Sequence, residues 1–256
     1  MRALAWVVLV AASLALVNLA PTLSLRTPGM QQLTGEHVRL FHQDEEAAAQ
    51  EVFALAEGRA AELADLLGVQ EPVAVTVYVY DDQATMQRKK YGLFAPLLGL
   101  DWYIGDNIGT DVLLTSPANP GPAHDHDTVR DAVLHEIVHA MSSVADPGMS
   151  YWLDNGLAGY LSGQEPTHLT GSASRIPTLE QTRVSGPLAP LRFADMDGYA
   201  FSYTYVEHLT EAYGWPAVRE LAQGASFEEA VGRTEEQVHQ EWTEFVRERY
   251  RVGEDR

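Results

Sequence analysis

The stretch Val133-Leu134-His135-Glu136-Ile137-Val138-His139-Ala140-Met141 sets three ionisable side chains in an otherwise apolar run. The run predicts a buried helix over residues 127–143, and burying ionisable groups costs free energy unless they have partners. Residues four apart on a helix share a face, so His135 and His139 can present two imidazoles to one cation. Because neutral imidazole nitrogen is a preferred zinc ligand, the stretch predicts that this helix binds Zn2+.

Glu136 follows the first of these histidines but lies further around the helix, where a metal-bound water would sit. A carboxylate at that point can take the proton of the water and later return it to a leaving amine. The alternative is a pair of core histidines with ordinary partners and a surface glutamate. The residues therefore predict a hydrolytic zinc site with Glu136 as its catalytic base.

Strand and helix patterns on both sides of this stretch predict an α+β fold. Residues 73–80 are mostly β-branched or aromatic and predict the clearest strand, with another at 37–41. Weaker strands at 102–104 and 111–115 are expected to form an antiparallel pair around a turn at 105–109. Further helices are predicted at 44–67, 151–162, 199–213, 215–223, 226–231 and 234–250.

The composition of the 256-residue chain excludes several classes of function. The chain carries 36 acidic residues against 17 Lys and Arg, a formal net charge of −19, whereas nucleic-acid binding requires a basic surface. It has no cysteine, which excludes disulfides, thiolate metal ligands and a cysteine nucleophile. We therefore expect no nucleic-acid partner.

The N-terminal segment is predicted to lie outside the folded domain. Residues 3–20 carry no charge, so residues 1–20 predict a signal anchor or a cleaved signal peptide. Arg2 before this run places the remainder in an extracytoplasmic location, membrane-anchored by an N-terminal helix or secreted, with membrane contact through this segment only. Residues 21–34 predict a linker, and residues 35–256 predict one domain.

Two later segments carry a family resemblance. Tyr151-Trp152-Leu153-Asp154-Asn155-Gly156-Leu157-Ala158-Gly159-Tyr160 is a W-L-x-x-G-L-A-x-Y block, and an aromatic run follows at 199–214. Together with H-E-x-x-H, they make residues 37–250 resemble the peptidase MA-like family of gluzincin-type zinc metallopeptidases. The resemblance implies a zincin-like fold, with a small mixed or antiparallel sheet packed on an active-site helix and a helical C-terminal half. It also implies a polypeptide substrate paired with an edge strand, expected at 111–115.

The third zinc ligand departs from the family pattern. The family has a Glu before the Gly of the W-L block, and this chain has Asn155 there, preceded by Asp154. An amide oxygen is a poorer zinc donor than a carboxylate. Three alternatives are open: Asp154 supplies the carboxylate, Asn155 binds weakly or through water, or the domain has lost its metal.

Other polar residues are weaker candidates. Tyr199 and Tyr203 can each supply a phenol that stabilises an oxyanion, although packing is an alternative for both. Residues 124–127, His-Asp-His-Asp, are best explained as a helix N-cap, and His168 as a solvated loop histidine.

These residues lead to two main hypotheses of different class, beside a third in which zinc only holds helices together, which the retained Glu136 disfavours. The first is an extracytoplasmic zinc-dependent peptide-bond hydrolase. The second, favoured by Asn155, is a catalytically silent peptidase-like domain that binds a protein or peptide partner at the cell envelope.

Overall fold

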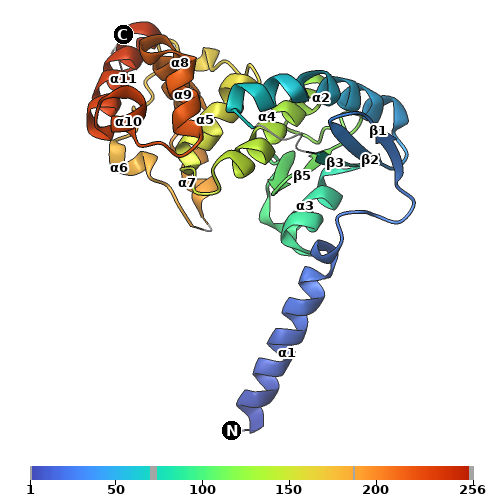
Figure 1. Ribbon diagram of the computed structural model, residues 1–256. Coiled ribbons are helices and arrows are strands. Elements are labelled where there is room, and N and C mark those ends of the chain that lie inside the picture. Colours follow the sequence, from blue (N-terminus) through green and yellow to red (C-terminus); the bar gives the residue numbers. More distant parts are fainter. Residues whose placement is uncertain (1, 70–73, 187, 254–256) are drawn as a thin grey trace. The chain divides into compact units, whose positions relative to one another are not determined.

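The computed structural model describes residues 2–69, 74–186 and 188–253 (Figure 1). They form two compact units, the first with residues 2–58 and 74–136 and the second with residues 59–69, 137–186 and 188–253. The first unit holds all the strands of the described chain, and the second is helical. The predicted α+β class is therefore confirmed, with a small mixed sheet followed by a helical C-terminal half.

The first unit is built on a five-stranded sheet with the order β1-β2-β3-β5-β4. The outer pairs, β1 with β2 and β4 with β5, are antiparallel, whereas β2, β3 and β5 are parallel. The strands are β1 Gln31–Thr34, β2 Val38–His42, β3 Val75–Tyr80, β4 Gly105–Ile108 and β5 Asp111–Thr115. The predicted strand at 73–80 is β3, and position 73 lies outside the described residues.

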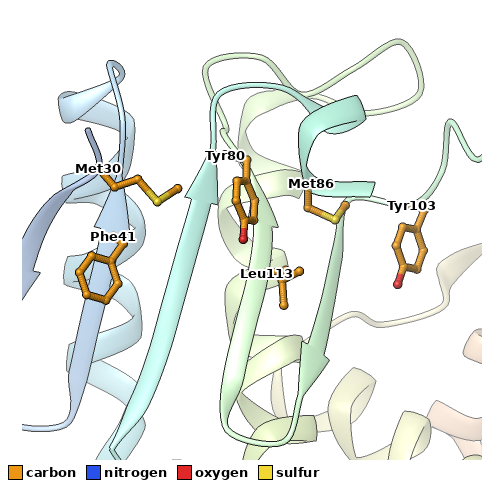
Figure 2. Close-up of a cluster of buried hydrophobic side chains, with 6 residues drawn as sticks. All are labelled: Met30, Phe41, Tyr80, Met86, Tyr103 and Leu113. Atoms are coloured by element: carbon orange, nitrogen blue, oxygen red, sulfur yellow. The ribbon is translucent and has the colours of Figure 1, made fainter. Parts of the chain in front are cut away.

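One face of the sheet carries a cluster of buried side chains (Figure 2). The cluster consists of Met30, Phe41, Tyr80, Met86, Tyr103 and Leu113. The phenol of Tyr80 donates a hydrogen bond to the carbonyl of Leu25 at 2.8 Å, which ties the segment before β1 to the sheet. Residues 31–34, which the sequence placed in a linker, thus belong to the fold, because β1 pairs with β2 and the chain before it packs on the core.

The hairpin at the other edge differs from the prediction. Residues 102–104, expected to be a strand, are a turn end and an irregular segment, because the Tyr103 amide donates to the Leu100 carbonyl and the Tyr103 carbonyl accepts from Gln83. The first strand of the hairpin is instead β4, followed by a tight turn in which Gly109 has φ +58. Residues 111–115 are β5, which pairs on both sides, so the prediction that they form the edge strand is wrong. That edge belongs to β4.

Helices cover the first unit, and two of them continue into the second. The helical elements are α1 Arg2–Leu19, η1 Ala20–Leu23, α2 Glu46–Leu67, α3 Gln83–Tyr91, η2 Ala95–Leu98 and α4 His126–Ala145. The sequence analysis did not predict α3, which Asp82 caps by accepting a hydrogen bond from the Thr85 amide at 2.7 Å.

The prediction of a transmembrane helix is wrong. Among the described residues, no helix is both long enough and apolar enough to cross a membrane. Helix α1 has 18 residues, with Arg2 at its start and Asn18 near its end. Its whole length is about 27 Å, against a hydrocarbon core of about 30 Å.

The second unit is a set of packed helices: α5 Tyr151–Leu161, η3 Thr167–Leu169, α6 Leu179–Thr182, α7 Ala189–Asp195, α8 Gly198–Tyr213, α9 Trp215–Ala222, α10 Phe227–Val231 and α11 Glu235–Tyr250. Helices α5 and α8 lie close together, since a Cβ at Gly156 would collide with the carbonyl of Ser202. Trp242 of α11 is fully buried and meets the rings of Trp152, Phe201 and Tyr205 edge to face. The helices predicted here, at 151–162, 199–213, 215–223, 226–231 and 234–250, are confirmed, with end points that differ by at most one residue.

Candidate functional site

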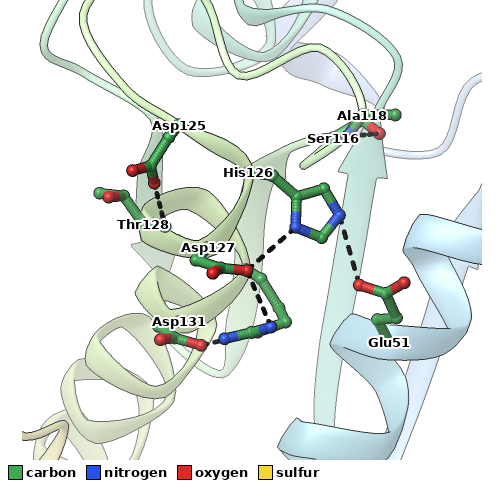
Figure 3. Close-up of polar contacts among 9 residues, drawn as sticks. Glu51, Ser116, Ala118, Asp125, His126, Asp127, Thr128 and Asp131 are labelled. Atoms are coloured by element: carbon green, nitrogen blue, oxygen red, sulfur yellow. Dashed lines mark hydrogen bonds and ion pairs between the residues drawn. The ribbon is translucent and has the colours of Figure 1, made fainter.

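Helix α4 carries the H-E-x-x-H motif, and a set of polar contacts fixes its start (Figure 3). The carboxylate of Asp125 accepts a hydrogen bond from the Thr128 amide at 2.8 Å, which confirms the predicted N-cap. His126 lies 3.3 Å from Glu51 of α2, so the first turn of α4 is held against α2 within the first unit. Asp125 and His126 therefore have structural roles.

The motif occupies the middle of this continuous helix. His135 and Glu136 are buried, each with 8% of its surface exposed, and His139 follows His135 one turn later. The predicted helix is thus confirmed, and its period places the two imidazoles on one face. His135 is therefore buried, and the side chain of His139 is 12% exposed.

Glu136 lies against the edge of the sheet. A Cβ built on Gly105 of β4 would come within 2.8 Å of Glu136 Oε1 and 2.9 Å of its Cγ. A side chain at this position would force the Glu136 carboxylate to shift from where it lies. Gly105 is a site residue that the sequence analysis missed; its signal was a glycine at the start of a short polar strand.

Tyr91 of α3 lies near enough to Glu136 for the Glu136 charge to raise the pKa of its phenol. Burial, together with the charges of Asp106 and Glu136, raises the pKa of Tyr91 to about 12. Its phenol donates a hydrogen bond to the Tyr103 hydroxyl at 3.0 Å. Tyr91 therefore remains a neutral phenol at physiological pH, and the sequence analysis did not identify it.

The register of β4 shows which backbone groups face outward. The Thr115 amide donates to the Ile104 carbonyl at 2.9 Å, which makes these two residues a hydrogen-bonded pair. Such pairs alternate along an antiparallel ladder, so Gly105 and Asn107 direct their backbone N–H and C=O away from β5. Gly105 thus combines an outward-facing backbone with contact to Glu136.

In the second unit, His139 is held by a carboxylate of α5. Its Nδ1 lies 2.8 Å from Asp154 Oδ2, while Asp154 Oδ1 is buried without a hydrogen-bond partner. A carboxylate on one ring nitrogen fixes the tautomer and orientation of an imidazole. In this structure Asp154 therefore orients the imidazole of His139.

Asn155, which follows Asp154 on α5, is only 3% exposed. Its Nδ2 donates to the Tyr151 carbonyl one turn back at 2.8 Å, so the amide oxygen is the atom left to act as an acceptor. An amide oxygen is neutral, and it would hold zinc less tightly than the family's glutamate.

The two tyrosine candidates lie on α8 of the second unit. Tyr199 is 37% exposed and meets the ring of Phe193 edge to face at 4.9 Å. The ring of Tyr203 packs on that of Tyr160, with the ring centroids 5.4 Å apart. Burial, together with the charge of Glu207, raises the pKa of Tyr203 to about 12. His168, the loop histidine, pairs with Asp197 at 3.1 Å. The Tyr203 phenol therefore remains protonated at neutral pH.

Zinc binding at this motif stays a prediction. In the described part of the chain, no three side chains of the His, Cys, Asp and Glu types are gathered closely enough to hold a metal ion. The donors fit zinc only in part: α4 supplies two imidazoles, and Asp154 orients one of them. Within the described residues, the motif therefore supplies two histidines but no carboxylate as a third ligand.

Comparison of the chain with models of known protein families and with curated protein sequences finds no match.

Proposed function

We propose that this protein is a zinc-dependent peptide-bond hydrolase of the gluzincin type, with a zincin-like arrangement of sheet and helix. The observation that carries the proposal is the contact of Glu136 with Gly105. It brings a buried carboxylate of the H-E-x-x-H helix against an edge strand, where an extended peptide can pair by β-augmentation.

His135 and His139 would hold the zinc through their imidazoles, and Asp154 would keep His139 in the productive orientation. Zinc, when bound, supplies Lewis acidity that polarises a peptide carbonyl and acidifies water. The third ligand of the zinc would be the amide oxygen of Asn155 or a solvent molecule. A site with two histidines and no carboxylate ligand is expected to bind zinc more weakly than a three-ligand site.

Glu136 performs the proton transfers. It takes a proton from the attacking water and returns it to the nitrogen of the leaving amine, as one carboxylate can do in both halves of the reaction. The outward N–H and C=O of Gly105 bind the substrate backbone, which positions a peptide bond beside that carboxylate. Tyr199 and Tyr203 remain candidates for a donor to the oxyanion.

The test uses the full chain and unfolded casein as substrate. Glu136→Gln is expected to lower cleavage by about 10²–10⁴-fold while zinc content, measured by elemental analysis, stays unchanged. Asp131→Asn is the matched control, because it removes a carboxylate from the same helix where it pairs only with surface Arg130. Cleavage that survives Glu136→Gln would refute the assigned base, and absence of zinc after reconstitution would refute the hydrolase.

Asn155 favours a second function, a peptidase-like domain that binds a polypeptide without cutting it. In that case casein-derived peptides bind the wild-type chain without being cleaved. Asn155→Glu restores the family's carboxylate, and a gain of both zinc affinity and cleavage in that variant would identify a weakened catalytic site.

A further inference from the structure

We propose that Lys90 and Asp106 limit the length of the peptide that the edge of β4 binds. They close the edge at Asn107 by bonding its outward backbone groups, and they leave it open at Gly105. The inference rests on the proposed function, since it takes an extended peptide to pair with β4. It adds a specificity-determining pair that lies outside the zinc-binding motif.

The closure consists of three contacts around one residue. Lys90 at the end of α3 lies 2.9 Å from Asp106 Oδ1, and their side chains are only 23% and 17% exposed. The Lys90 ammonium also donates to the Asn107 carbonyl at 2.8 Å. Asp106 Oδ1 accepts a hydrogen bond from the Asn107 amide at 2.6 Å. Both outward backbone groups of Asn107 are therefore already satisfied.

The edge is also closed on the other side of Gly105. Tyr103, the preceding outward-facing position, donates its amide to the Leu100 carbonyl at 3.0 Å. Its own carbonyl accepts a hydrogen bond from the Gln83 amide group at 3.0 Å. Within the described residues, Gly105 is thus the outward position of this edge without such a closing contact.

This arrangement limits the hydrogen bonds that a peptide can form. In an antiparallel pair, one peptide residue exchanges two hydrogen bonds with Gly105, and the next such exchange falls two residues further, on Asn107. Because Lys90 and Asp106 occupy the groups of Asn107, a longer extended peptide gains nothing there. The edge therefore suits a short extended segment that turns away from the sheet.

The chain provides a matched control beside Lys90. Lys89 and Lys90 are its only lysines, and they have different partners. Lys89 donates to the Ser24 carbonyl at 2.7 Å, away from β4, whereas Lys90 reaches the edge. Substituting one or the other separates a loss of charge from a loss of the closure.

The experiment measures peptide binding in the Glu136→Gln background, so that nothing is cleaved. Fluorescein-labelled alternating Ser-Val peptides of four and six residues are titrated with the full chain by fluorescence anisotropy. With Lys90 and Asp106 present, the two peptides are expected to bind equally. In Lys90→Met/Asp106→Ala, the longer peptide is expected to bind about tenfold more tightly than the shorter one, the gain of one to two net hydrogen bonds.

Lys89→Met and Lys90→Arg should keep the equal affinities. The proposal is overturned by a length preference already present with the closure intact, by no preference in the double variant, or by no peptide binding to either protein. Self-association of the double variant without a length preference also overturns it, and assigns the pair to protection of the edge against aggregation. If the double variant does not fold, Lys90→Met frees the Asn107 carbonyl alone and should give about a threefold preference.

Failure of the hydrolase proposal gives a different result. A length effect in the Glu136→Gln background, with no cleavage of casein by the chain that retains Glu136, would keep the edge closure and reject the catalytic function.

Discussion

Nδ1 of His139 donates a hydrogen bond to Asp154 Oδ2 at 2.8 Å, across 15 residues of sequence. The contact joins the H-E-x-x-H helix to the W-L block, the two segments that carry the family resemblance. In the proposed zinc site, Asp154 then acts by orienting the His139 imidazole and does not itself have to be a zinc ligand.

Asp154→Ala is expected to lower zinc affinity by about 10–100-fold, since His139 loses the partner that fixes its tautomer. A competitive titration against a chromophoric chelator measures the affinity. Asp131→Ala, on the same helix and paired only with Arg130, is the control and should bind zinc as the wild type does. Equal affinities in the two variants would show that Asp154 does not orient a ligand.

Gly105→Ala is expected to reduce casein cleavage by about 100-fold at unchanged zinc content. The added Cβ would lie 2.8 Å from Glu136 Oε1, so the carboxylate must move away from the strand, and a displaced catalytic group costs rate. The control is Gly58→Ala on α2, where a Cβ meets nothing within 4 Å. Full activity in Gly105→Ala would contradict the placement of the base at the edge strand.

Local pattern predicted much of this architecture. The apolar period of α4, the β-branched run of β3 and the helices of the second unit follow from side-chain spacing, which depends on neighbouring residues. The same period placed His135 and His139 on one face of α4. These features are confirmed because burial and periodicity agree in each of them.

The edge strand could not be predicted in this way. Residues 105–108, Gly-Asp-Asn-Ile, have no alternation of apolar and polar side chains, and long-range contacts fix their extended conformation. The bond from Lys90 to Asn107 and the space that Gly105 leaves for Glu136 join segments distant in sequence. The role of Asp154 likewise depends on how α5 lies against α4 beside His139, which no spacing rule supplies.

Thr204→Val is expected to lower the free energy of unfolding by about 1–3 kcal/mol. The Thr204 hydroxyl accepts a hydrogen bond from the Trp242 indole N–H at 3.0 Å, and both side chains are fully buried. Valine keeps the volume but leaves the indole N–H without a partner. Urea unfolding measures the change. Thr243→Val is the control, because that hydroxyl only bonds a carbonyl of its own helix, and an equal loss in both variants would rule out the buried bond as the cause.

Glu57→Gln is expected to lower stability at pH 7 by about 1 kcal/mol, because the Glu57 carboxylate accepts hydrogen bonds from the amides of Glu36 at 2.7 Å and Val38 at 2.8 Å. Burial alone would raise the pKa of Glu57, but the amides of Val38, Glu36 and His37 lower it overall, below its ordinary 4.5. A carboxyl whose pKa is lower in the folded state stabilises the fold above its unfolded pKa and loses that contribution as pH falls through the folded value.

The difference in stability between wild type and Glu57→Gln should therefore shrink as pH drops below about 4.5, the ordinary pKa of a glutamate. Urea midpoints at pH 7 and at about pH 3 measure it. A difference of the same size at both pH values would mean that the charge of Glu57 does not hold the start of β2.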